Sequence, residues 1–221
     1  MAIKRSYEDG CAAAHALDLV GERWALLIVR ELLLGPKRFT DIRAGLPTIS
    51  PNVLSQRLTE LEASGILQQR KLPPPASIQV YELTPWGAEL EPLVLSLARC
   101  GVRSPKFRRG AALGADALIL SFKAMFAPAA ALKQRVTIEL RVAEAPFFAI
   151  VDRGKLEVGR GPASAPDAVL SADPATVLSL AYGKADLDLM AASGQAEYLG
   201  DKTALLRFFS CFALPAPAGS D

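Results

Sequence analysis

The fold of this chain is decided by the stretch TISPNVLSQRLTELEASG, residues 48–65. Its ends predict a helix, because Ser50 is a preferred N-cap, Pro51 fits the first helical position and Gly65 can adopt the left-handed conformation that ends a helix. At about 100° per residue, the large apolar residues gather on one side of that helix: Val53, Leu54, Leu58 and Leu61. The residues almost opposite are polar and uncharged: Asn52, Ser55, Gln56 and Thr59.

The outer face of this helix favours recognition of DNA bases. A solvated helix usually exposes Lys and Glu, whereas this one presents amides and hydroxyls. The amides of asparagine and glutamine can bind adenine through two hydrogen bonds in the major groove. From these residues alone, a surface helix in any α-rich domain is the other interpretation, and the rest of the chain decides between the two.

Length and composition set the broad class of protein. The 221 residues allow one large domain or two modest ones, and the 51% of hydrophobic residues can bury a sizeable core. No apolar run reaches the roughly 18 residues that a membrane span needs, and the N-terminus lacks an apolar signal-peptide core. Three widely spaced cysteines form neither a disulfide framework nor a zinc pattern. We therefore expect a soluble cytoplasmic protein without a membrane partner, a metal site or a cofactor.

Charge is distributed unevenly between the two halves of the chain. The formal net charge is +2, but residues 1–110 hold 15 Lys and Arg against 11 Asp and Glu, whereas residues 111–221 hold 10 against 12. The first half is therefore mildly basic, as phosphate-binding modules tend to be.

The segments before the opening stretch predict further helices. Residues 11–20 read as a short Ala-rich helix, and residues 23–34 as a strongly apolar helix that includes Trp24 and ends at Gly35-Pro36. Arg38-Phe39 is expected to form a brief strand, and Thr40 to cap a short helix over residues 41–44. Two helices joined by a short turn, the second with a polar outer face, have the helix-turn-helix layout.

The segments after Gly65 predict a wing and a further helix. Residues 66–72 and 78–83 read as two strands, and the proline-rich turn 73–77 between them cannot be helical. Arg70 and Lys71 on the first strand either reach DNA phosphates or are ordinary solvated charges. A helix capped by Thr84 is expected to run to about Cys100.

Residues 11–101 resemble the HxlR-type winged-helix transcription regulators, relatives of the MarR group. Five stretches and Cys11 carry this resemblance: LDLVGERW (17–24), LIVREL (27–32), GPKRFTDI (35–42), ISPNVLSQRL (49–58) and YELTPWG (81–87). The chain departs from the family pattern at Ala12-Ala13, where members often have Cys-Pro and a hydrophobic residue.

The resemblance implies a homodimer, built from the terminal helices of a domain over residues 1–101, that binds pseudo-palindromic double-stranded DNA. The residues implied to face the bases are Ser50, Asn52, Ser55, Gln56 and Thr59. Those implied to hold phosphates are Arg38, Thr40, Arg70 and Lys71. Arg57 lies close to the apolar side of the helix, so it either reaches a phosphate or pairs with Glu60 or Glu62.

Some members of this family use the cysteine at the position of Cys11 as an oxidant sensor. A reactive thiol must be exposed and have a lowered pKa, and the sequence shows neither property. The other interpretation is that Cys11 is a passive small hydrophobic residue. His15 is expected to lie on a helix face, because it has no Cys or His partner at metal-ligand spacing.

The second half predicts a separate α+β domain. Residues 102–113 form a basic linker that is a candidate neighbour of DNA phosphates, and residues 215–221 are expected to fray. Between them, helices are predicted over residues 114–126, 174–182, 185–192 and 201–212. Strands are predicted over residues 135–142, 146–152, 155–159, 168–171 and 195–199.

Residues 114–214 resemble the sterol-carrier-protein-like fold. The stretches DAVLSADPATVL (167–178) and AEYLGDKTAL (196–205) carry this resemblance. Some members of that family hold lipids in an apolar tunnel between the sheet and the helices. The residues that either line such a tunnel here or simply fill the core are Phe122, Phe126, Leu180, Leu187, Met190, Phe208 and Phe212.

The sequence contains no recognisable catalytic motif: a Gly-rich phosphate loop, a nucleophile elbow and an HExxH pattern are all missing. We therefore expect a homodimeric, sequence-specific transcription regulator, controlled by a hydrophobic small molecule in the second domain or only stabilised by that domain. The alternative is a lipid-carrier protein whose winged helix mediates protein contacts. An enzyme with its site in the second domain is a third, weaker reading.

Overall fold

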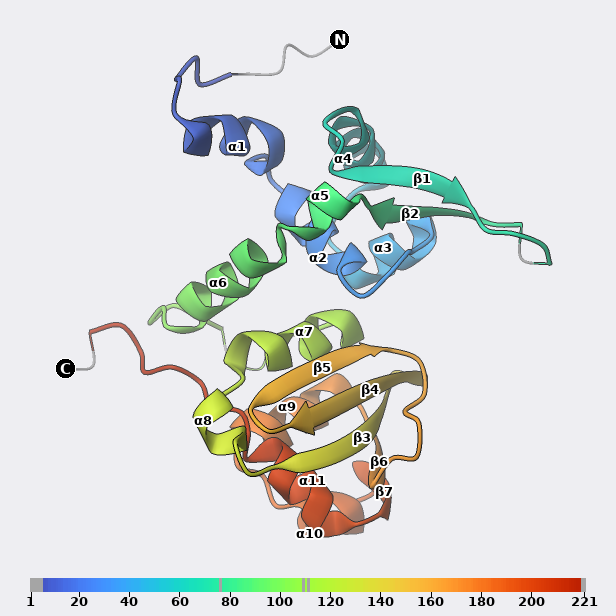
Figure 1. Cartoon of the computed structure of the whole chain (residues 1–221), viewed down its shortest axis with the longest axis vertical. Helices are drawn as coiled ribbons and strands as arrows, with labels where there is room; N and C mark the ends of the chain where they lie inside the picture. Colours follow the sequence, from blue (N-terminus) through green and yellow to red (C-terminus); the bar gives the residue numbers. More distant parts are fainter. Residues whose placement is uncertain (1–5, 76, 109, 111, 220–221) are drawn as a thin grey trace. The chain divides into compact units, whose positions relative to one another are not determined.

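The computed structural model describes residues 6–75, 77–108, 110 and 112–219 (Figure 1). It divides into two compact units, Met1–Val94 and Leu95–Asp221. Several residues of the predicted segments lie outside the described part: residues 1–5 at the N-terminus, Ala76 in the wing turn, Arg109 and Ala111 in the linker, and Ser220 and Asp221 in the tail.

The first unit has the predicted helical order followed by a hairpin. Its elements are α1 (Ala12–Val20), α2 (Ala25–Leu32), α3 (Phe39–Gly45), α4 (Pro51–Ala63), β1 (Leu67–Lys71), β2 (Gln79–Leu83), α5 (Pro85–Ala88) and the first turn of α6 (Glu91–Val102). The strands β1 and β2 are antiparallel, with Leu67 opposite Leu83 and Lys71 opposite Gln79. Figure 1 shows this hairpin extending away from the helices of its unit. The predicted winged helix-turn-helix is confirmed.

The core of this unit is built on the apolar side of α4. Leu54, Leu58 and Leu61 are at most 1% exposed and pack with residues of α2 and α3 such as Ile28 and Ile42. Burying one such side chain contributes about 2 kcal/mol. Val53, which was expected on the same side, is only partly buried at its edge. Because this side is buried, the polar side of α4 faces solvent.

Both ends of α4 follow the local signals. The Ser50 hydroxyl accepts a hydrogen bond from the Val53 amide at 3.3 Å. Gly65 has a φ of +72°, the left-handed conformation that was expected there. The Thr84 hydroxyl donates to the Gly65 carbonyl at 2.7 Å and accepts from the Gly87 amide at 3.0 Å. The end of α4 is therefore tied to the start of α5.

Three expected boundaries in this unit are wrong. Helix α3 begins at Phe39 with Arg38 as its N-cap, because the Asp41 carboxylate accepts from the Arg38 amide, so Arg38-Phe39 forms no strand. Helix α2 begins after Trp24, which has a left-handed backbone and is only partly buried.

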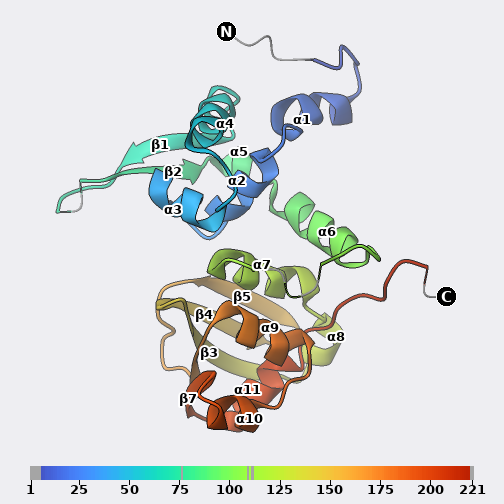
Figure 2. The same ribbon diagram turned by 180° about the vertical axis from the view of Figure 1, so that it is seen from behind.

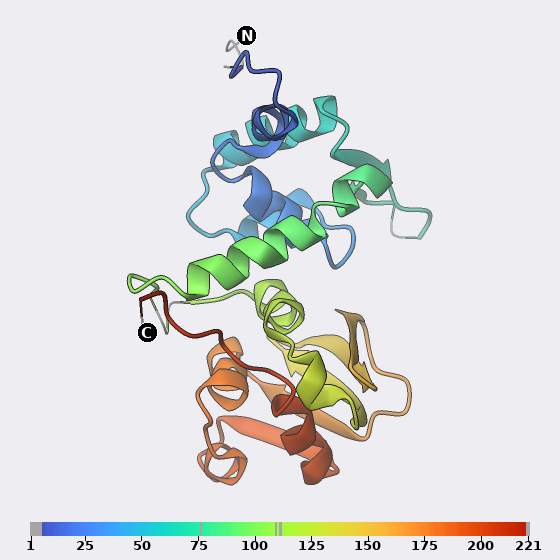
Figure 3. The same cartoon turned by 60° about the vertical axis from the view of Figure 1, so that its left-hand side comes forward.

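The helix expected over residues 85–100 is two helices, α5 and α6. Pro92 has no amide hydrogen to donate to the Ala88 carbonyl, which interrupts the helical hydrogen bonding between them. Figure 3 shows α6, in green, as a separate extended helix after the short α5.

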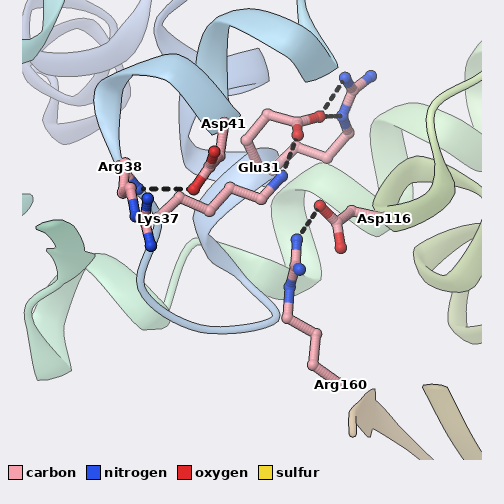
Figure 4. Close-up of polar contacts among 7 residues, drawn as sticks. Glu31, Lys37, Arg38, Asp41, Asp116 and Arg160 are labelled. Atoms are coloured by element: carbon pink, nitrogen blue, oxygen red, sulfur yellow. Dashed lines mark hydrogen bonds and ion pairs between the residues drawn. The ribbon is translucent and has the colours of Figure 1, made fainter. Parts of the chain in front are cut away.

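A buried ion pair connects α2 to the segment that leads into α3. The Lys37 ammonium lies 2.5 Å from the Glu31 carboxylate, and both side chains are at most 5% exposed (Figure 4). Glu31 also pairs with Arg30 at 2.7 Å. The backbone of Lys37 pairs with that of Tyr81 in β2, through amide-to-carbonyl bonds of 2.9 and 2.7 Å. One residue thus joins helix α2 to the wing.

The second unit is a five-stranded sheet with helices packed against it (Figure 2). The strand order is β5-β4-β3-β6-β7, and only the pair β3–β6 is parallel. The strands are β3 (Arg135–Val142), β4 (Ala145–Asp152), β5 (Lys155–Arg160), β6 (Ala168–Ala172) and β7 (Ala196–Gly200). The helices are α7 (Ala115–Met125), α8 (Pro128–Ala131), α9 (Pro174–Tyr182), α10 (Leu187–Ala192) and α11 (Lys202–Phe209). This confirms the predicted α+β architecture.

Most elements of this unit lie where the sequence predicted them. Val136, Ile138, Leu140 and Val142 alternate into the core along β3, as expected from the period-two pattern. The short helix α8 was not predicted. The last helix ends at Phe209 and not at Phe212, because the following residues form backbone hydrogen bonds with Met125 and Ala127.

The expected fraying of residues 215–221 is wrong for residues 216 and 218. The Ala218 amide donates to the Arg103 carbonyl at 2.8 Å, and Nε of Arg103 donates to the Ala216 carbonyl at 3.0 Å. Val102, which was placed at the start of the linker, is buried in a small cluster with Ala124 and Met125. The tail and the end of α6 therefore belong to the second unit.

None of the helices in the described part of the chain combines the length and the apolar character that a membrane span requires.

Removing the carboxylate of Glu31 should destabilise the first unit. We expect Glu31→Gln to cost about 3 kcal/mol, because it removes the buried negative charge that faces Lys37. Urea unfolding followed by tryptophan fluorescence reports this unit alone, since Trp24 and Trp86, the only tryptophans of the chain, both lie in it.

Exposed Glu89 supplies the matched control, and Glu89→Gln should change the stability by less than about 0.5 kcal/mol. The double substitution Glu31→Leu with Lys37→Met should regain most of the loss, because apolar residues can replace a buried pair. A loss under about 1 kcal/mol for Glu31→Gln would contradict the role given to this pair.

Candidate nucleic-acid interface

The outer face of α4 is exposed over its whole length. Asn52, Ser55, Gln56 and Thr59 are all exposed, as is the capping residue Ser50. The four side chains within the helix project from the side opposite the buried leucines. These four candidates for base reading therefore share one solvent-facing surface, which carries amides and hydroxyls and no formal charge, and Ser50 lies at the end of the helix.

Hydrogen bonds within α4 orient part of this face. The Gln56 amide donates to the Glu60 carboxylate at 2.9 Å, which leaves one amide hydrogen and the carbonyl oxygen for another partner. The Thr59 hydroxyl donates to the Ser55 carbonyl at 3.1 Å. Ser50 uses its oxygen as a cap acceptor, so its hydroxyl hydrogen can still be donated.

Arg57 is occupied by carboxylates. Its guanidinium pairs with Glu60 on α4 and with Glu22, 3.1 Å away in the segment before α2, and its side chain is 15% exposed. Of the alternatives left open by the sequence, pairing with Glu60 is the one that forms. The local sequence pattern does not predict the contact with Glu22, because nothing in that pattern brings Glu22 near α4. Arg57 thus holds α4 against the start of α2.

The wing arginine also has a carboxylate partner. Arg70 binds Glu82 across the hairpin, with nitrogen-to-oxygen distances of 2.8 and 2.9 Å, and Gln68 donates to the same carboxylate at 2.9 Å. These hydrogen bonds lower the pKa of Glu82 and raise the pKa of Arg70. A phosphate at this position would compete with Glu82.

The remaining phosphate-contact candidates are exposed. Lys71 lies at the end of β1, and Arg38 and Thr40 lie at the start of α3. The Thr40 hydroxyl donates to Asp41 at 3.3 Å. Together with the base-reading candidates of α4, these residues come from three elements of the first unit: α3, α4 and the wing.

The other face of the wing carries a polar network that sequence reasoning missed. The Gln69 side chain donates to the Tyr81 hydroxyl at 3.1 Å and accepts from the Gln79 side chain, and the backbone amide of Gln69 donates to the Glu62 carboxylate on α4 at 3.2 Å. Desolvation and the nearby Glu62 raise the pKa of Tyr81. The strand register that brings these side chains together is not visible in a local pattern.

Cys11 is exposed and is the N-cap residue of α1. The backbone amide groups of Ala14 and, to a smaller extent, Ala13 lower the pKa of its thiol. Burial instead raises the pKa of Cys211. The structure thus supplies the two properties, exposure and a lowered pKa, that the sequence left undetermined for Cys11.

Among the candidate pocket residues of the second unit, the four phenylalanines form one cluster. The rings of Phe122, Phe208 and Phe212 contact one another with centroids 4.7 to 5.5 Å apart, and Phe126 packs on Phe212 at 6.0 Å. Leu180 and Leu187 are buried on α9 and α10, while Met190 is half-buried. The aromatic rings occupy the space between the helices by direct contact.

Comparison with known proteins gives a match for each unit. Residues 19–105 match the HxlR-like helix-turn-helix family, and residues 121–212 match the SCP-2 sterol transfer family. Neither is a family of enzymes. Both matches agree with the families that the sequence motifs resemble.

The similar proteins with known sequences include bacterial regulators. The HTH-type transcriptional regulator YvaP of Bacillus subtilis is 41% identical over 85 residues, which span 38% of this chain and 78% of that protein. The HTH-type transcriptional regulator YodB of the same organism is 41% identical over 76 residues, which span 34% and 68%.

Among solved structures, the reduced form of YodB is 33% identical, with a TM-score of 0.39 over 43% of this chain and 95% of that chain. Because identity above 30% extends over more than two thirds of the relatives YvaP and YodB, the chain belongs to the HxlR-like helix-turn-helix family.

Proposed function

We propose that the protein is a transcription regulator that reads a specific DNA sequence as a homodimer. The observation that carries this proposal is the exposed, uncharged face of α4, held outward by the burial of Leu54, Leu58 and Leu61. Hydroxyls and amides on a helix that fits the major groove can discriminate base pairs, whereas charged residues alone would bind any phosphate backbone.

In this proposal residues 1–101 form the DNA-binding and dimerisation domain, and the base-reading residues are Ser50, Asn52, Ser55, Gln56 and Thr59. Arg38, Thr40, Arg70 and Lys71 hold phosphates. The exposure of Leu17 on α1 and of Leu93 and Leu97 on α6, each more than 40% exposed, supports dimerisation through these helices. Such a regulator would act in the cytoplasm, on its operator.

Residues 102–113 connect this domain to residues 114–214, which we propose bind a small apolar effector. The SCP-2 match and the aromatic cluster around Phe122 support this role. Because the rings contact one another, an effector would have to part them. Regulation further demands that the effector bind differently to the DNA-bound and free states.

The alternative function is a lipid carrier whose winged helix mediates protein contacts. The SCP-2 match favours it, since that family is named for sterol transfer. Specific DNA binding separates the two proposals.

Substitution of the two amides of α4 should abolish sequence preference. We expect Asn52→Ala with Gln56→Ala to lower the affinity for a selected operator by at least about tenfold, since each bidentate amide contributes about 1–3 kcal/mol of discrimination. Binding to random DNA should stay unchanged because phosphate contacts remain. Fluorescence anisotropy on both DNAs measures the ratio.

Gln195→Ala, at an exposed glutamine of the second unit, is the matched control. Retained sequence preference in the double variant would contradict the base-reading face.

An operator with two half-sites one helical turn apart, about 34 Å, should bind two subunits together, and a single half-site should bind much more weakly. Equal affinity for the two DNAs would argue against the dimer.

Removal of the Glu82 carboxylate should strengthen DNA binding. Glu82→Gln frees Arg70 for a phosphate, so we expect affinity for operator and random DNA to rise by about three- to tenfold. The salt dependence should steepen by about one unit in the log–log slope. The comparison is made by titration at several salt concentrations.

Glu157→Gln, at an exposed strand position of the second unit, removes an equal charge and should have little effect. Adding Arg70→Gln to Glu82→Gln should cancel the gain. If the double variant binds as tightly as Glu82→Gln, Arg70 is not the group that reaches DNA.

We also propose that Cys11 senses oxidants. Because the pKa of its thiol is lowered, more thiolate is present at a given pH, and alkylation by iodoacetamide should reach half its maximal rate at a lower pH than in an unstructured peptide of the same segment. Mass spectrometry of the Cys11 peptide measures the rate. Diamide should change the DNA affinity of the wild-type chain but not of Cys11→Ser, and an unchanged wild-type affinity would refute the sensor.

A further inference from the structure

A groove of about 480 Å³ lies in the second unit between the last turns of α6 and the C-terminal tail. It is lined by Arg99, Cys100, Arg103, Pro215 and Ala218. Figure 2 shows the tail, in red, running beside this end of α6. Arg99, Cys100, Arg103 and Ala218 are exposed and Pro215 is half-buried, so the groove is open to solvent.

The two arginines of this groove are held in place by backbone carbonyls. Nε of Arg99 donates to the Ala124 carbonyl, and Nε of Arg103 donates to the Ala216 carbonyl at 3.0 Å. Each bond uses one of the five donor hydrogens of a guanidinium. Because the two residues are one helical turn apart, both positive charges lie at the same end of α6.

These arginines differ from others of their unit in lacking a carboxylate. Among the described residues, neither Arg99 nor Arg103 has an ion-pair partner within 4.0 Å. Five other arginines of this unit each face an acidic side chain: Arg135 and Arg153 face Asp152, Arg141 faces Glu139, Arg160 faces Asp116 (Figure 4), and Arg207 faces Asp201.

We propose that this groove binds a small amphipathic anion. A carboxylate or phosphate head accepts hydrogen bonds from Arg99 and Arg103, and a short apolar body lies against Pro215, Ala218 and the side of Cys100. A charged head satisfies the two guanidinium groups, and contact with Pro215 and Ala218 removes part of the apolar body from water. The site is separate from the aromatic cluster of the proposed effector domain and does not depend on DNA binding.

The thiol of Cys100 is a reporter for this site, because a ligand in the groove covers it. The full chain is treated with N-ethylmaleimide, and modification of the Cys100 peptide is followed by mass spectrometry. Five probes separate the contributions at about 1 mM: octanoate, octyl phosphate, 1-octanol, acetate and inorganic phosphate.

Octanoate or octyl phosphate should slow the modification of Cys100 by about tenfold, which corresponds to a Kd near 0.1 mM. The probe that protects more identifies the head group. Octanol lacks the charge, and acetate and phosphate lack the apolar body, so these three should protect by less than about twofold. Equal protection by octanol, or none by either charged amphiphile, would overturn the proposal.

Variants test the two halves of the site. Arg103→Gln should remove most of the protection, and Arg103→Lys should restore part of it. Arg108→Gln, at an exposed arginine that does not line the groove, is the matched control. Octanoate should protect Cys100 in this variant as it does in the wild type. Ala218→Phe fills the groove without changing charge and should also remove the protection.

Circular dichroism of each variant checks that the chain is folded. If Arg103→Gln unfolds the chain, the comparison of octanoate with octanol in the wild type and the effect of Ala218→Phe still decide the outcome. Full protection by octanoate in both Arg103→Gln and Ala218→Phe would place the ligand elsewhere and refute the site.

Discussion

The buried contact between Glu31 and Lys37 is the interaction on which the first unit depends. Two charges at most 5% exposed are costly to remove from water, and each offsets part of the cost of the other. The same lysine residue pairs its backbone with Tyr81 in the wing. Helix α2, the turn into α3 and the hairpin are therefore constrained by one residue, which fixes the frame that presents α4.

Local signals predicted α4 well, because each of them acts within the helix or at its ends. Ser50 caps, Gly65 takes the left-handed conformation, and the spacing of the leucines directs one face inward. Two carboxylate partners of nearby arginines were not predictable in this way. Glu22 reaches Arg57 from another segment, and Glu82 reaches Arg70 only through the register of the hairpin, so both contacts are products of tertiary structure.

The errors have two different origins, one local and one tertiary. The break between α5 and α6 was missed because the apolar spacing continues through Pro92, although that residue cannot donate the helical hydrogen bond. The tail over residues 215–221 was expected to fray because chain termini are poorly ordered unless other segments hold them. Its hydrogen bonds to Arg103 come from a distant helix, and the groove beside Arg99 exists only once both segments have met.

The charge arrangement of the first unit affects how much more tightly a regulator of this kind binds its operator than random DNA. Contacts to phosphate raise affinity for every sequence, so they do not improve the ratio between operator and genome. Here Glu60, Glu22 and Glu82 occupy two arginines close to the base-reading helix. In the proposed function, that pairing lowers the affinity for random DNA, while the uncharged face of α4 keeps its base contacts. The preference for the operator over random DNA then depends on the carboxylates that keep Arg57 and Arg70 from phosphates, as well as on the amides of α4 that contact bases.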